Sequence, residues 1–150
     1  MSVRREVRAH VVALLRAAPA LADVQVSATL PGEDQALTAA IWVDRISSRF
    51  ETRGLGGLPP RQSETLTVDL AIDAYGEAPR QLDGSAAAVD RAEELLGVIE
   101  DVIGLDPTLG VGQPAVALVK FTTVTARARE RGWLAQATCR IEVTNYPAIP

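Results

Sequence analysis

The C-terminal part of the chain, residues 115–146, constrains the fold most, because apolar and polar residues alternate there along two long runs. The apolar residues of the second run share one parity: Trp133, Ala135, Ala137, Cys139, Ile141 and Val143. Successive side chains leave a strand on opposite faces, so an alternation of this length indicates extended strands. A polar segment, residues 129–132, separates the two runs and ends in glycine. We therefore predict a long antiparallel β-hairpin at this end of the chain.

Two helices and three further strands are predicted upstream. Residues 2–17 and 85–103 carry apolar residues at steps of three and four, which is typical of amphipathic helices. Residues 24–30, 36–47 and 64–75 alternate with a period of two and are predicted to be strands. The first two of these strands are expected to pair as a hairpin, because a turn-forming Pro-Gly-Glu-Asp segment separates them.

The element order α-β-β-β-α-β-β predicts one α+β domain over residues 1–150. The expected architecture is a mostly antiparallel sheet of about five strands with both helices packed on one face. The other face of the sheet is expected to carry threonine, alanine, Trp42 and Phe121 in place of lysine and glutamate. A half-apolar second face of this kind suggests burial against another subunit.

The composition fits a globular domain, with 150 residues of which 47% are hydrophobic. The formal net charge of -4 argues against nucleic-acid binding through bulk charge, which needs many basic groups facing phosphates. A single cysteine cannot form an internal disulfide, and no apolar stretch approaches the roughly 20 residues that cross a bilayer. We therefore expect a protein that is made in the cytoplasm, carries no signal peptide and does not enter a membrane.

The residue inventory offers little for catalysis. His10 is the only histidine and has no partner near it in the sequence, so we expect a structural role for it. Cys139 falls on the apolar parity of its strand, where a buried small residue is far more common than a nucleophile. Asp69 and Asp73 share a strand face, and solvated strand faces carry such carboxylates routinely. Without a metal-ligand pair or a cofactor motif, we expect no metal, no cofactor and no enzyme activity.

Two segments are candidates for self-assembly or partner contacts. Residues 49–63 form a long irregular segment in which apolar residues and arginines stand between glycines and prolines. The predicted hairpin tip carries arginines at alternate positions, which lie on one face of a strand. The candidate contact residues are Arg49, Phe50, Arg53, Leu55, Leu58, Arg61, Arg127, Arg129 and Arg131. The tip arginines are suited to a passing phosphate or to a neighbour's acidic helix residues, Asp90, Glu93, Glu94, Glu100 and Asp101. A simple tether and a solubilising turn remain the alternatives for the two segments.

The layout of most of the chain resembles that of a known family. It combines a short amphipathic opening helix, the run Ser63–Leu70, a second helix closing on Asp106–Gly110, and long strands ending in Ile141–Tyr146. In these features the chain resembles the tail terminator (tail completion, minor tail) proteins of long-tailed bacteriophages and related prophages. The resemblance implies an α+β fold, assembly in the host cytoplasm into a homo-oligomeric ring, commonly a hexamer, and a place in the virion at the head-proximal end of the tail.

The resemblance also implies partners. The ring would cap the tail tube protein, stop its polymerisation and offer a surface to the head connector or head-closure protein, while genome DNA passes through the lumen without specific binding. Residues 49–63 would be a local elaboration and residues 147–150 a C-terminal tail. Two other functions stay open: another neck ring, such as a head-closure or connector protein, and a small-molecule-binding regulatory α+β domain.

Overall fold

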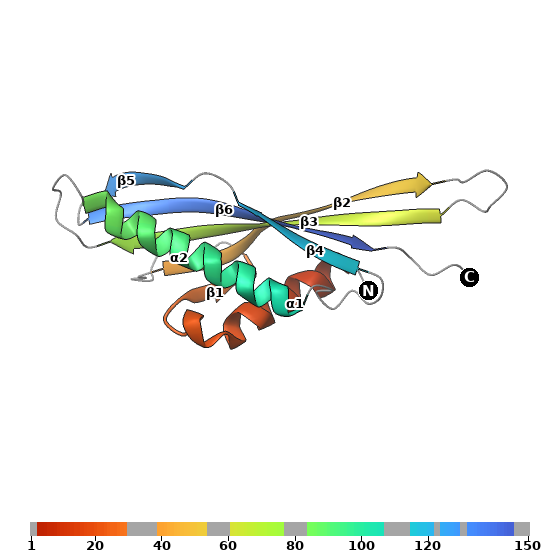
Figure 1. Ribbon diagram of the computed structural model, residues 1–150, viewed down its shortest axis with the longest axis horizontal. Coiled ribbons are helices and arrows are strands. Elements are labelled where there is room, and N and C mark those ends of the chain that lie inside the picture. Colours follow the sequence, from red (N-terminus) through yellow and green to blue (C-terminus); the bar gives the residue numbers. More distant parts are fainter. Residues whose placement is uncertain are drawn as a thin grey trace.

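The computed structural model describes residues 3–29, 39–53, 61–76, 84–106, 115–121, 124–129 and 132–145. In chain order its elements are α1 (Val3–Ala17), the 3-10 turn η1 (Pro19–Leu21), β1 (Gln25–Ser27), β2 (Ala39–Arg53), β3 (Arg61–Gly76), α2 (Gly84–Leu105), β4 (Ala115–Phe121), β5 (Thr125–Arg129) and β6 (Gly132–Asn145). Both helices lie on the same side of a long twisted sheet (Figure 1). The predicted α+β class and the order of its elements are therefore confirmed.

The sheet has the strand order β1-β2-β3-β6-β4, and β5 pairs with β6 beyond the end of β4. All neighbours are antiparallel except β1 and β2, which run parallel, with Val26 opposite Ile41. The predicted hairpin between residues 24–30 and 36–47 is therefore wrong. The chain between the two paired segments, residues 28–38, is longer than a tight turn, so its turn-forming residues do not fix the direction of the next strand.

The central β2–β3 hairpin is longer than the sequence indicates. Its pairing runs from Ala39 opposite Ala74 to Arg53 opposite Arg61 without leaving the ladder, apart from one bulge between Val43 and Arg45. Both ends of the segment predicted to be irregular, residues 49–63, are thus strand. Apolar alternation fades there, but backbone hydrogen bonds between antiparallel neighbours do not depend on it.

The predicted C-terminal hairpin is confirmed, but its first arm is two strands. Phe121 pairs with Cys139 and Thr125 pairs with Gln136, so four positions along the first arm correspond to three positions along β6. This one-residue mismatch shifts the register, as a β-bulge does, and exchanges the two parities between β4 and β5. The side chain of Phe121, which was expected to share the second face with Trp42, lies outside the described part of the chain.

The core lies between the sheet and the two helices. Along β3 the predicted inward parity is fully buried: Leu66, Val68, Leu70, Ile72 and Ala74. The helices meet it with their apolar stripes, which include Val7, Val11 and Leu15 from α1 and Leu95, Ile99 and Ile103 from α2. Each large side chain buried in this way stabilises the fold by about 1.5–3 kcal/mol relative to exposure. Trp42 and Leu134 belong to the face of the sheet away from the helices, and they are buried as well. Parts of this second face are therefore inaccessible to solvent.

Candidate functional site

The part of the chain that the structure describes contains no group of three or more histidine, cysteine or acidic residues that could hold a metal ion. None of the described helices is long and apolar enough to cross a membrane. Within the described part of the chain, the histidine and the cysteine both contribute to the packing of the fold.

His10 has a partner that the sequence does not reveal. Its Nε2 lies 2.6 Å from Oδ2 of Asp106, and both side chains are about one-third exposed. The two residues are 96 positions apart in the chain, so the sequence around His10 does not point to this partner. The contact ties α1 to the residue that follows α2, which supports the structural role predicted for His10.

Cys139 is fully buried in the middle of β6. Burial, followed by the nearby charges of Asp69 and Glu100, raises the pKa of its thiol from 9.0 to about 12. A thiol of this kind stays protonated at neutral pH and is a poor nucleophile. The prediction that Cys139 is a buried small residue is confirmed.

The side of the sheet away from the helices, here called the outer face, carries two polar cross-strand pairs. Asp69 lies directly opposite Arg140, whose Nε donates a hydrogen bond of 2.9 Å to Oδ1 of the carboxylate. This bond raises the pKa of the Arg140 guanidinium further. Asp73 lies opposite Gln136, whose Nε2 donates to Oδ1 at 3.3 Å. The expectation of two solvated carboxylates is wrong, since both are partnered and the Asp69 side chain is only 13% exposed.

On the outer face, the basic side chains are more exposed than most of the acidic ones. The exposed arginines that the strand register assigns to this face are Arg45, Arg49, Arg127 and Arg140. The acidic residues of the same face, Asp69, Asp73 and Glu142, are all half-buried. One exposed acid, Asp44, sits at the bulge of β2. The outer face therefore presents mainly positive charge to its surroundings.

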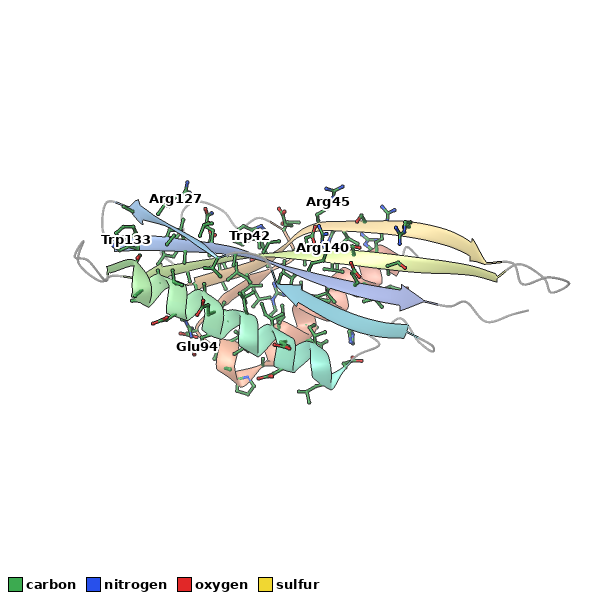
Figure 2. All side chains as sticks on the ribbon, turned by 45° about the horizontal axis from the view of Figure 1, so that its top comes forward. Trp42, Arg45, Glu94, Arg127, Trp133 and Arg140 are labelled. Carbon is green, nitrogen blue, oxygen red and sulfur yellow. The ribbon has the colours of Figure 1, made fainter. Side chains whose placement is uncertain are left out.

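The solvent side of α2 has the opposite sign. Its exposed charged residues, here called the acidic stripe, are Asp90, Glu93, Glu94, Glu100 and Asp101. Arg91 is half-buried and forms ion pairs of 3.1 Å with Asp23 and with Glu94. Figure 2 shows Arg45 and Arg127 pointing away from the sheet on one side and Glu94 pointing away on the helix side. The outer face of the sheet is thus mainly basic, and the solvent side of α2, on the other side of the sheet, is acidic.

A hollow of about 290 Å³ lies on the outer face between Arg127 and the Asp69–Arg140 pair. Its lining includes Trp42, Ala71, Asp73, Thr125, Gln136 and Thr138. The hollow is formed where β5 replaces β4 beside β6, so it follows from the register shift. It is open to solvent.

The predicted contact residues fall into two groups at opposite ends of the sheet. Arg49 lies opposite Thr65 of β3. Arg127 lies opposite Leu134 of β6, which in turn lies opposite Tyr75 of β3. Both arginines are exposed. Four others have strand backbones, while their side chains lie outside the described part of the chain: Phe50, Arg53, Arg61 and Arg129. Leu55, Leu58 and Arg131 lie outside the described residues altogether.

Sequence reasoning missed Arg45 and Arg140 as surface cations. Arg140 was on the polar parity of its strand, which was a usable signal. Arg45 reaches the outer face only because the bulge after Val43 shifts the parity of β2, and a bulge has no reliable mark in a single sequence.

The fold is shared with a chain in the solved structure described as the virion of a native gene transfer agent (GTA) particle. The two chains superpose with a TM-score of 0.50 at 13% sequence identity, over 92% of this chain and 94% of the other. No model of a known protein family matches the sequence. No curated protein matches it either. At this identity the likeness establishes a common fold over nearly the whole length of both chains.

Proposed function

We propose that this protein is a structural component of a virion and acts as a tail terminator: a homo-oligomeric ring that caps the tail tube, stops its polymerisation and joins it to the head. The observation that carries the proposal is the match of fold, end to end, to a chain of a virion particle. The layout of helices and strands in the sequence supports the same class independently. Its partners would be copies of itself, the tail tube protein and the head connector, with DNA passing through the lumen.

The described surface is consistent with assembly. The thiol and the imidazole are both engaged inside the fold, and the hollow on the outer face is open to solvent. Charged groups instead gather on two broad faces, as expected of a subunit that meets neighbours on more than one side. We propose accordingly that the protein works by assembly and catalyses no reaction.

Electron microscopy of the purified protein mixed with tail tubes tests this function. We expect rings in the free protein, and in the mixture we expect rings seated at one end of tubes that no longer elongate. DNA-filled heads, added separately, distinguish a terminator from another neck ring, because a head-closure protein binds heads before it binds tails. A chain that stays monomeric at high concentration and ignores both tubes and heads would contradict the proposal.

A further inference from the structure

The two charged faces of the subunit are complementary to each other. The basic set on the outer face that is free for a partner consists of Arg45 and Arg127. Both are exposed, and within the described part of the chain neither makes a hydrogen bond or an ion pair. The acidic stripe on α2 is exposed along its length, and among the described residues Glu94 is its one member with an ion pair, formed with Arg91 at 3.1 Å. The unpaired arginines lie on one side of the subunit and the acidic stripe lies on the other. A second copy of the same chain can therefore place its acidic stripe against these arginines.

The spacing of the two sets is comparable. The acidic stripe runs from Asp90 to Asp101, which is about 16 Å at the 1.5 Å rise of a helix. On the outer face, Arg127 lies beside Leu134 and Arg45 in the row of Arg140, so the two arginines are about 20 Å apart along the strands and, with β5 three strands away from β2, about 14 Å apart across them. Their backbones are therefore about 25 Å apart on a diagonal of the sheet. The helix meets both arginines when it lies oblique to the strands and the two long side chains reach inward to the ends of the stripe.

The shape of α2 permits a close approach. Gly97 lies in the middle of the stripe, and a Cβ placed on it would meet nothing within 4 Å. The helix backbone is therefore uncovered between Glu94 and Glu100. Leu105, four positions beyond Asp101 and so on the same side of the helix, is 85% exposed and supplies an apolar anchor at the end of the stripe.

We propose that the acidic stripe of one subunit docks along the outer face of the next, with its two ends at Arg127 and Arg45. The two surfaces lie on opposite sides of the subunit, so the contact is heterologous, which is the type of contact that forms a ring when the rotation between neighbours closes. This interface rests on the proposed ring-forming function and specifies how its subunits join. It also implies dependence on salt, because exposed charges are screened over about 8 Å at physiological ionic strength.

A charge-exchange experiment tests the interface. The first variant, Arg45→Glu with Arg127→Glu, makes the outer face acidic; the second, Asp90→Lys with Asp101→Lys, reverses the charge at both ends of the acidic stripe. Either variant alone sets like charges against each other, and we expect the concentration needed for half-assembly to rise about tenfold or more. A mixture of the two variants restores opposite charges at every junction of an alternating ring, so we expect assembly to recover in the 1:1 mixture.

Matched controls use exposed charges on α1, outside both surfaces: Arg5→Glu and Glu6→Lys. These should assemble like the wild type, and circular dichroism should show every variant folded. Sedimentation velocity of each protein and of the mixture gives the readout. If the wild type forms rings while both paired variants assemble normally, or while the mixture fails to recover, the interface is wrong and the ring function stands. If the wild type itself forms no ring, with or without tail tubes, the proposed function fails together with it.

Discussion

Cys139 and Arg140 are neighbours on β6, yet they lie on opposite faces of the sheet in opposite environments. The thiol is fully buried under the helices, whereas the arginine side chain is half exposed and pairs with Asp69. The face under the helices is held by burial of apolar area, a large and non-directional contribution. The outer face is held by single polar pairs and presents free charge. The first face builds the subunit, and the second is available to build an assembly.

The largest expected effect comes from the covered face. Leu70→Ala empties a fully buried position on β3, and we expect a loss of about 2–5 kcal/mol in the free energy of unfolding. Thr67→Ala, on the outer face of the same strand, should change it by less than about 0.5 kcal/mol. Urea unfolding of both variants measures the difference. Equal losses would show that the outer face is as tightly packed as the core.

A second prediction concerns the close contact between β3 and α2. A Cβ on Gly76 would lie 2.9 Å from the backbone nitrogen of Ala88, so Gly76→Ala must push the strand and helix apart. We expect a destabilisation of about 1–3 kcal/mol, the usual cost of overpacking. The midpoint of thermal unfolding reports it. An unchanged midpoint would mean that α2 does not pack on the end of β3 as closely as described.

The raised pKa of Cys139 predicts a pH dependence. The folded protein holds the thiol proton up to about pH 12, whereas the unfolded chain loses it near 9.0. The corresponding stability is therefore complete below pH 9 and is lost as the pH rises from 9 towards 12, at about 1.4 kcal/mol per pH unit. Urea unfolding at several pH values should show a shallower fall for Cys139→Ala than for the wild type. Parallel curves would contradict the burial of the thiol.

The smallest effect is expected on the solvent side of α2. Gly97→Ala adds a methyl group in open space and removes a flexible residue from a helix interior, so we expect the subunit to gain up to about 1 kcal/mol. Gly97→Ala is expected to stabilise the subunit and Gly76→Ala to destabilise it, because the first adds a methyl group on the solvent side of α2 and the second adds one where β3 packs against α2. A destabilised Gly97→Ala subunit, measured below the concentration of assembly, would mean that the helix is covered within its own chain.

The face of the sheet under the helices could be predicted from the sequence, because the periodicity of apolar residues indicates which side chains point into the core. A period of two along β3 and β6, and steps of three and four along both helices, identify most of the buried side chains. The buried residues Val12, Ala88 and Leu134 lie outside these patterns. The outer face could not be read in the same way. The β2 bulge brings Arg45 to that face, the shift between β4 and β5 exchanges parities, and the partner of His10 lies 96 residues away. Each of these is a long-range or register effect, which local patterns do not encode. The parallel pairing of β1 with β2 was missed for the same reason.

The central claim is that this chain is a subunit of a closed ring. Sedimentation velocity of the wild-type protein over a wide range of concentration, at low and at high salt, tests it most directly. The account predicts one discrete oligomer that replaces the monomer as concentration rises, stops growing at a fixed size, and dissociates more readily in high salt. A monomer at every concentration, or open-ended growth without a limiting size, would contradict it.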